Sequence, residues 1–324
     1  MFQEPHKKED KPLVAQVGDQ WLEDRKKGIG GSDIGCILGL NKWKTPLMVW
    51  EEKTGRRNEV VDNDLTRSGH RLEPVVADWF AEATGLQLIN PGNHVMKHKT
   101  HDWCIGTPDR ITHKGNEDPA AVGVLEIKTT GQSFDNSTMP PYWFTQVNWY
   151  SGIYRSNYSQ SSCSQNFIAW FERVTGHFDH TALDFDPSFF QYLLDQAGEF
   201  WENYVLKDTP PPPVNSDDVL RLYPKHLSGK TIEASRDLRE MIDQLHDVNA
   251  RLKEAKQAKD EIDEKIKFIM CDAEAVMVDG APAVTWRAGK DTVAFDMDKF
   301  AIDHPELYIK YATTKPGVRR FLIK

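Results

Sequence analysis

The chain has 324 residues, of which 39% are hydrophobic and 27% are charged, the balance of an ordinary globular protein. Its formal net charge of −9 argues against a protein that coats nucleic acid by bulk attraction, but leaves room for an enzyme with acidic metal ligands. No run of about 18 apolar residues occurs and the first residues are charged, so we expect a cytoplasmic protein without a membrane-spanning helix. The four cysteines are widely separated, which argues against a zinc ribbon or a disulfide framework.

The first patterned segment is glycine-rich, with the sequence GIGGSDIGCILGLNKWKTP over residues 28–46. It lacks the Lys-Ser/Thr pair of a Walker loop and the third glycine of a dinucleotide fingerprint. Local chemistry instead predicts a short helix that Ser32 or Asp33 caps and Gly39 ends.

Three cations precede this short helix in the chain, namely Arg25, Lys26 and Lys27. A helix N-terminus with flanking cations can hold an anion, and Ser32 is the best-placed hydroxyl to join it. The alternative from the sequence alone is a capped helix without a ligand.

A second helix is predicted over residues 68–85, with Val76, Trp79 or Phe80, and Ala83 on its apolar face and Gly85 as its end. Glu73 precedes Pro74, and the pattern alone reads it as a surface acid or a first-turn residue.

Two strands are predicted next, one ending near Thr112 and one over residues 122–130, joined by a polar loop that contains Lys114, Gly115 and Asn116. On the second strand Glu126 and Lys128 share one face, because successive side chains of a strand alternate. Asp109, after Pro108, could complete a pair of carboxylates.

A pair of carboxylates such as Asp109 and Glu126 suits Mg²⁺ or Mn²⁺, which lower the pKa of a bound water and neutralise charge on a phosphodiester. Lys128 would then orient the attacking water or stabilise the phosphorus centre. The alternative is an ordinary Glu/Lys pair on a solvated strand, since three such residues occur easily by chance.

A further helix is predicted over residues 140–154, where Gln146 and Tyr150 are four apart and so share a face. The same two side chains would also suit a core or an interface. Four consecutive prolines within residues 207–218 then predict a boundary between a first domain, residues 1–213, and a C-terminal extension, residues 214–324.

The extension contains a coiled-coil-like helix over about residues 235–270, whose apolar residues recur at steps of three and four. Short strands are expected after it, around Asp279-Gly280 and around residues 315–317. Arg319 and Arg320 could contact DNA or lie on a solvated strand end.

Five ordered motifs together resemble the YqaJ-type and lambda-exonuclease-like recombination nucleases of the PD-(D/E)XK superfamily. They lie between Trp21 and Tyr154 and are the glycine-rich segment with its continuation through Gly55, GHRLEP, GTPDR, LEIKTT and QVNWY.

The resemblance implies an active site. Asp109, Glu126, the carbonyl of Ile127 and Glu73 would hold two Mg²⁺ or Mn²⁺ ions, Glu73 acting through the second ion or a water. Lys128 would be the catalytic lysine, with Gln146 and Tyr150 beside it. A cation before the short helix, one of Arg25, Lys26 and Lys27, would bind a 5′-terminal phosphate together with Ser32.

The fold implied is an α/β restriction-endonuclease-like core, a mixed central sheet flanked by helices. The activity implied is 5′ to 3′ digestion of double-stranded DNA ends, leaving 3′ single strands for an annealing protein, in a ring of three subunits. Two alternatives stay open, a structure-selective or restriction-like endonuclease and a silent DNA-end or protein-binding module built on the same fold.

Overall fold

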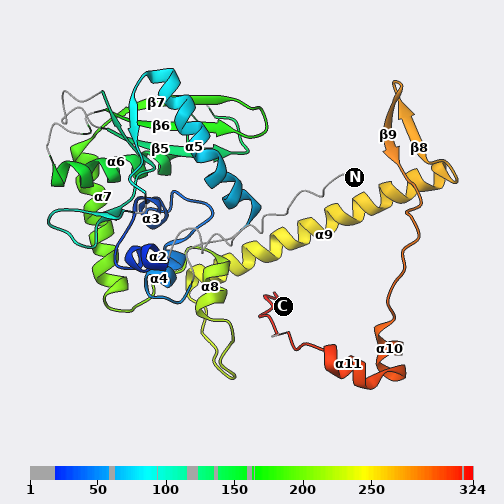
Figure 1. The fold of residues 1–324 in the computed structure, drawn as a ribbon. Coiled ribbons are helices and arrows are strands. Elements are labelled where there is room, and N and C mark those ends of the chain that lie inside the picture. The colour runs from blue at the N-terminus through cyan, green and yellow to red at the C-terminus, as the bar shows by residue number, and fades with distance from the viewer. Residues whose placement is uncertain are drawn as a thin grey trace. The chain divides into compact units, whose positions relative to one another are not determined.

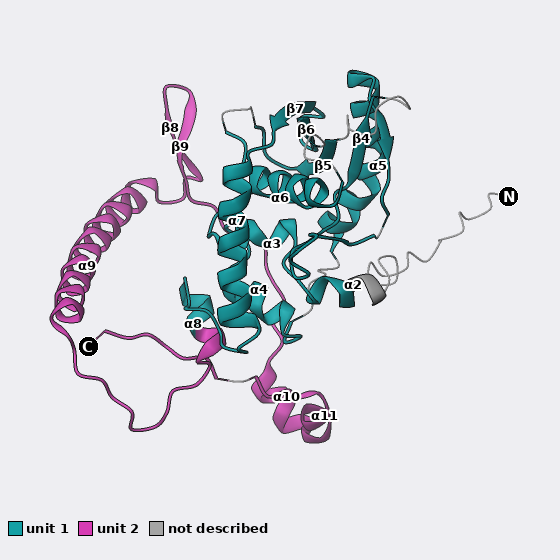
Figure 2. Ribbon diagram, turned by 90° about the vertical axis from the view of Figure 1, so that its left-hand side faces the viewer, with its two compact units in different colours: residues 1–219 teal, residues 220–324 magenta. Residues whose placement is uncertain are grey.

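The computed structural model describes residues 19–57, 63–92, 94–114, 123–134, 138–158, 163, 165–315 and 317–323. The chain divides into two compact units, residues 1–219 and residues 220–324, which Figure 2 colours separately. The proline-rich segment from which we predicted a boundary after residue 213 lies just before this division. The assignment of residues 1–213 and 214–324 to separate functional domains remains a prediction.

The first unit is built on a five-stranded sheet with the strand order β1-β4-β5-β6-β7 (Figure 1). The β5–β6 pair is parallel, whereas the other three pairs are antiparallel. The elements of this unit are α2 (Asp19–Lys26), α3 (Gly31–Ile37), α4 (Pro46–Lys53), α5 (Asp64–Thr84), β1 (Gln87–Ile89), β2 (Met96–Lys97), β3 (Ile105–Gly106), β4 (Arg110–His113), β5 (Gly123–Thr130), α6 (Pro141–Asn157), β6 (Gln165–Glu172), β7 (Phe178–Asp184), α7 (Pro187–Phe200) and the π-helix η1 (Trp201–Val205). Helix α8 (Ser216–Leu222) contains the division between the units. The predicted α/β class, a mixed sheet flanked by helices, is confirmed.

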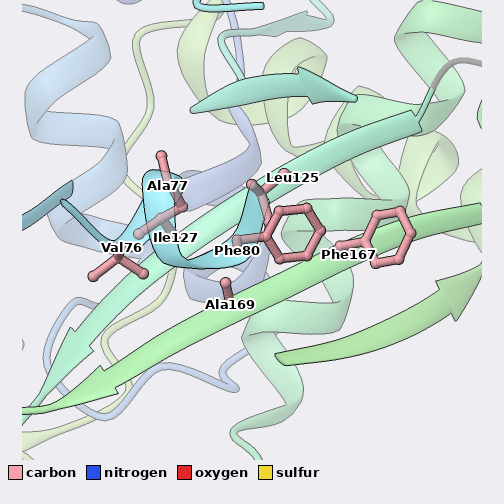
Figure 3. Packing of buried hydrophobic residues seen from close by; sticks show 7 residues of the cluster. All are labelled: Val76, Ala77, Phe80, Leu125, Ile127, Phe167 and Ala169. Atoms are coloured by element: carbon pink, nitrogen blue, oxygen red, sulfur yellow. The ribbon is translucent and has the colours of Figure 1, made fainter. Parts of the chain in front are cut away.

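The central strand β5 separates two chemically different faces of the sheet. Leu125 and Ile127 join an apolar cluster with α5, in which Val76 and Phe80 are fully buried (Figure 3). Glu126 and Lys128 lie on the alternate side, where they contact α6. The alternation of β5 therefore turns an apolar face toward one helix and a charged face toward the other.

Helix α5 is longer at its start than the sequence predicted. Asn63 caps it by accepting a hydrogen bond from the backbone N–H of Thr66, so the helix begins at Asp64 rather than near Ser68. Pro74 is therefore inside the helix, and Glu73 is a mid-helix residue rather than a first-turn residue. Gly85, with φ of 70°, ends the helix as predicted.

The short helix and the helix that carries Gln146 form as predicted. Helix α3 spans Gly31–Ile37, and Gly39 follows it with φ of 69°. Its N-cap is Gly30 rather than Ser32 or Asp33, and the Asp33 side chain accepts a hydrogen bond from the Gly30 backbone N–H. Helix α6 spans Pro141–Asn157, begins with a proline at its first position and is buried over most of its middle. The predicted strand beginning at Val122 is β5, which starts at Gly123; Val122 and the predicted loop residues Gly115 and Asn116 lie outside the described residues.

The second unit contains the long helix as predicted, α9 (Arg236–Met270), capped by the Ser235 side chain. A hairpin of β8 (Ala275–Val278) and β9 (Ala281–Thr285) follows, turning at Asp279 and Gly280, which both have positive φ.

The prediction of a second set of strands around residues 315–317 was wrong for the residues on either side of Pro316, which itself is not described. Two short helices precede that stretch instead, α10 (Met297–Asp303) and α11 (Pro305–Tyr311). Asp296 caps the first, and Pro305 occupies the first turn of the second, two start signals that the sequence analysis passed over.

No helix in the described part of the chain is long and apolar enough to cross a membrane.

Candidate active site

A cavity of about 390 Å³ opens at β5, whose four consecutive residues 126–129 line it. Helix α5 contributes Leu65, Gly69, His70 and Glu73 to the cavity wall. The sheet and its loops contribute Asp109, Glu126, Ile127, Lys128, Thr129 and Arg173. The structure thus brings Glu73, Asp109, Glu126 and Lys128 to one place, although they are up to 55 positions apart in the sequence.

The pairing of β4 with β5 fixes Asp109 against the β5 backbone. Arg110 lies opposite Leu125 in the antiparallel register, so the residue before it meets the next part of β5. Asp109 Oδ2 accepts a hydrogen bond from the backbone N–H of Ile127 at 2.7 Å. One carboxylate is therefore oriented by the strand that carries the other.

Glu126, Lys128 and Gln146 form a connected group of side chains. Lys128 Nζ donates to Glu126 Oε1 at 2.6 Å and to Gln146 Oε1 at 2.9 Å. Gln146 Nε2 in turn donates to Glu126 Oε1 at 2.7 Å. Both donors use the same oxygen of Glu126, and the other oxygen, Oε2, is buried without a hydrogen-bond partner among the described residues.

Burial and mutual repulsion make these carboxylates hard to ionise. Burial raises the pKa of Asp109 well above its ordinary value, and the negative charges of Glu126 and Glu73 raise it further. Burial likewise raises the pKa of Glu126, although the nearby Lys128 opposes the shift. Burial alone would lower the pKa of Lys128, but Glu126 and Asp109 outweigh it and raise that pKa, so the lysine stays protonated.

Glu73 is held by a residue that the sequence analysis did not single out. Arg110 donates to Glu73 Oε1 at 2.6 Å, and its side chain is only 8% exposed. Arg110 follows Asp109 directly in the GTPDR motif, so its place beside a predicted metal ligand was the available signal. Arg173, which also lines the cavity, carried no comparable signal because it lies 45 positions beyond Lys128.

Tyr150 is the fully buried end of the group. Gln146 Nε2 donates to its hydroxyl at 3.1 Å, as expected for residues four apart on one helix face. A side chain at either Gly31 or Gly106 would come within 2.6 Å of the tyrosine ring. The two glycines therefore allow α3 and β3 to close on the ring and hold Gln146 in place.

The four residues predicted to bind a phosphate separate into two pairs. Arg25 donates to Ser32 Oγ at 2.9 Å, and Arg25 shares a small recess with Gly30, Gly31 and Tyr150. Lys26 and Lys27 instead form exposed ion pairs with Glu23 and Asp24, each at 2.7 Å. The structure brings Arg25 and Ser32 together next to Tyr150 and does not bring the two lysines there.

The donor set suits a hard divalent cation. Glu126 Oε2 is a buried carboxylate oxygen whose charge needs a partner, and Asp109 lines the same cavity. Glu73 is engaged by Arg110, and within the described ranges no three His, Cys, Asp or Glu side chains converge as a complete metal-binding group. The structure therefore presents a pair of carboxylates with Glu73 at one side, rather than a closed cage.

The fold and the site define an α/β domain with a carboxylate–lysine site at the centre of a mixed sheet. Residues 20–155 match the family model of the YqaJ-like viral recombinase domain. The resemblance drawn from the five motifs is confirmed.

Individual proteins similar to this chain include the YqaJ protein of Bacillus subtilis (strain 168), which is 27% identical over 319 residues, with 94% of each chain covered. Among solved structures, the alkaline exonuclease of Laribacter hongkongensis matches with a TM-score of 0.47 and 13% identity, covering 59% of this chain and 94% of that one. A phage-related exonuclease from Haemophilus somnus 129PT matches with a TM-score of 0.41 and 11% identity, covering 56% and 96%.

The raised pKa of Asp109 predicts that Asp109→Asn stabilises the metal-free protein at neutral pH. The folded protein binds this proton more tightly than the unfolded chain, so the free energy of unfolding falls as the pH rises above 3.8 through the raised pKa. Removing the charge should therefore add about 1 kcal/mol or more at pH 8, since one pKa unit corresponds to about 1.4 kcal/mol. The gain should shrink as the pH is lowered toward 5.

Urea denaturation in a chelator, at pH 5 and pH 8, measures this difference. Asp102→Asn is the matched control, because Asp102 is exposed and precedes β3 outside the cavity. A variant at position 109 that is less stable than the parent at pH 8 without metal would contradict the electrostatic account of the site.

Proposed function

We propose that the cavity beside β5 is the active site of a metal-dependent DNA exonuclease that hydrolyses phosphodiester bonds. The observation that carries the proposal is Glu126 Oε2, which is buried without a hydrogen-bond partner among the described residues and shares the cavity with Asp109 and Lys128. A buried anionic oxygen without a donor is costly, and a divalent cation removes that cost. The match of residues 20–155 to a viral recombinase domain family supports DNA as the substrate.

Asp109, Glu126 and the carbonyl of Ile127 would hold Mg²⁺ or Mn²⁺, with Glu73 contributing through a second ion or a water. The ions would neutralise charge on the phosphate and lower the pKa of the attacking water. Their number, two, is part of the proposal.

The protein's own groups orient the reactants. Lys128 stays protonated, so its ammonium can donate to the attacking water or to a phosphate oxygen. Gln146 holds both Glu126 and Lys128, and Tyr150 holds Gln146, which fixes the ammonium relative to the carboxylate. Arg173 at the cavity wall supplies a cation for the DNA backbone.

The polarity that we propose is 5′ to 3′. Arg25, a permanently charged group that hydrogen-bonds Ser32, is suited to bind the 5′-terminal phosphate of a duplex. The product would be a 3′ single strand for an annealing protein in the cytoplasm of the host cell. A ring of three subunits around the duplex would let an acidic chain stay on DNA without tight binding.

A structure-selective endonuclease is the second candidate, since the same residues would cut an internal bond. The recess lined by Arg25, whose guanidinium bonds Ser32, favours an end-directed enzyme, because a terminal phosphate differs from an internal one in charge.

Digestion of a linear duplex labelled at its 5′ or its 3′ ends, beside a closed circle, tests the proposal. We expect Mg²⁺-dependent release of mononucleotides from 5′ ends, no digestion in a chelator and an intact circle. Cutting of the circle would favour the endonuclease. No cleavage with either Mg²⁺ or Mn²⁺ would favour a silent binding module.

The same assay locates the chemistry through two substitutions. Lys128→Ala and Asp109→Ala should each lower the rate by at least about 100-fold, because each removes charge stabilisation at the reacting centre. Lys114→Ala and Asp102→Ala are matched controls on exposed positions and should retain the parent rate. Wild-type digestion by either cavity variant would refute the assignment.

Arg25 and Lys27 have different partners, which gives a prediction about recognition of the DNA end. Arg25→Ala should raise the KM for a 5′-phosphorylated duplex by about 10-fold or more, the loss expected for a charge-assisted contact. Lys27→Ala should change it little, because Lys27 faces Asp24 on an exposed surface. Steady-state kinetics with the 5′-phosphorylated duplex measures the KM of both variants. Equal changes in KM for Arg25→Ala and Lys27→Ala would contradict the separation of these cations in the structure.

A further inference from the structure

A second group of buried charges lies outside the cavity, between α3 and α4. The Asp33 side chain is fully buried and the Lys53 side chain is 1% exposed, and their Nζ and Oδ2 atoms are 2.7 Å apart. Lys44 reaches the other oxygen, Oδ1, at 3.0 Å and also pairs with Glu52. None of these four side chains lines the carboxylate cavity.

Besides pairing with one another, Asp33 and Lys53 each form a hydrogen bond with a backbone group. Asp33 Oδ2 accepts from the backbone N–H of Gly30 at 3.0 Å, directly before α3. Lys53 Nζ donates to the backbone carbonyl of Arg25 at 2.9 Å, near the end of α2. The pair therefore connects the end of α2 to the start of α3.

The two tied segments are those that carry Arg25 and Ser32. Ser32 lies between Gly30 and Asp33 in the first turn of α3, and its hydroxyl accepts from the Arg25 guanidinium. The ion pair thus fixes, relative to one another, the two backbone segments from which the guanidinium and the hydroxyl extend.

Stability alone does not account for burying these charges. Burial by itself would raise the pKa of Asp33, but the positive charges of Lys53, Lys44 and Arg25 lower it below its ordinary value, so the carboxylate stays ionised. A buried ion pair can be replaced by apolar side chains with little loss, or with a gain, in stability. What apolar side chains could not replace is the pair of directional bonds to the backbones of Arg25 and Gly30.

We propose that the buried Asp33–Lys53 pair is a positioning device that sets the geometry of the Arg25 and Ser32 recess and thereby the preference for a 5′-phosphorylated end. The inference rests on the proposed function and deepens it. Neither side chain touches the phosphate, so each acts through Arg25.

The test compares one duplex with 5′-phosphate ends and one with 5′-hydroxyl ends. In Lys53→Met we expect the ratio of kcat/KM values, phosphate over hydroxyl, to fall by about 10-fold, mainly through KM for the phosphorylated end. The hydroxyl-ended rate should stay within about 2-fold of the parent. Equilibrium binding of the phosphorylated duplex in a chelator should weaken in parallel, which gives a readout independent of cleavage.

Lys44→Met is the matched control, since Lys44 binds the same carboxylate from its other oxygen but does not donate to the Arg25 carbonyl. It should leave the ratio unchanged. Lys53→Arg keeps the buried positive charge and moves the donor, so it should lower the ratio even if Lys53→Met fails to fold.

Three outcomes would overturn the inference. The ratio could stay at its parent value in a folded Lys53 variant, or both substrates could lose activity equally, which is the result of a purely structural pair. A parent enzyme that digests both ends with equal efficiency would remove the preference itself, whereas a parent enzyme that digests neither would refute the proposed function instead.

Discussion

The Glu126 carboxylate is buried with one oxygen bound by two donors and the other bound by none among the described residues, and much of the first unit follows from accommodating it. Its neighbour Asp109 cannot move away, because the β4–β5 register and the Ile127 N–H hold it. Burial raises the pKa of both acids, and repulsion by Glu126 raises the pKa of Asp109 further. That repulsion favours a divalent cation at the cavity.

The surrounding elements hold the acid in this position. Helix α6 supplies Gln146, which binds Glu126 and Lys128 together, and Tyr150, which the glycines of α3 and β3 enclose. Helix α5 covers the other face of β5 with an apolar cluster and turns Glu73 toward the cavity, where Arg110 holds it. The apolar side of the sheet therefore provides the rigidity that the charged side requires.

Local patterns were sufficient to predict the elements that carry the site. The alternation in β5 placed Glu126 and Lys128 on one face, and the four-residue spacing in α6 placed Gln146 beside Tyr150. Periodicity could not predict that α5 begins at Asp64, because a cap at Asn63 decided it. In the second unit, α10 and α11 are short helices, so the Asp296 cap and Pro305 carried more signal than the apolar pattern.

Contacts between distant segments lay beyond the reach of sequence patterns. Nothing in the local sequence of Lys53 indicates that it bonds to the Arg25 carbonyl, and nothing near Arg173 indicates that it lines the same cavity as Asp109. The same limit explains why Arg25, Lys26 and Lys27 were equivalent candidates until their partners were known. The two lysines have acidic neighbours three residues earlier, and Arg25 reaches across to α3.

The most direct test of the account is a crystal structure of the protein with Mn²⁺, in which anomalous scattering locates the ion. We predict density in the cavity within ligand distance of Glu126 Oε2 and an Asp109 oxygen, and its loss in Glu126→Gln. A protein that digests DNA with Mn²⁺ yet binds the ion elsewhere, or leaves Glu126 Oε2 without it, would contradict the central role given to this carboxylate.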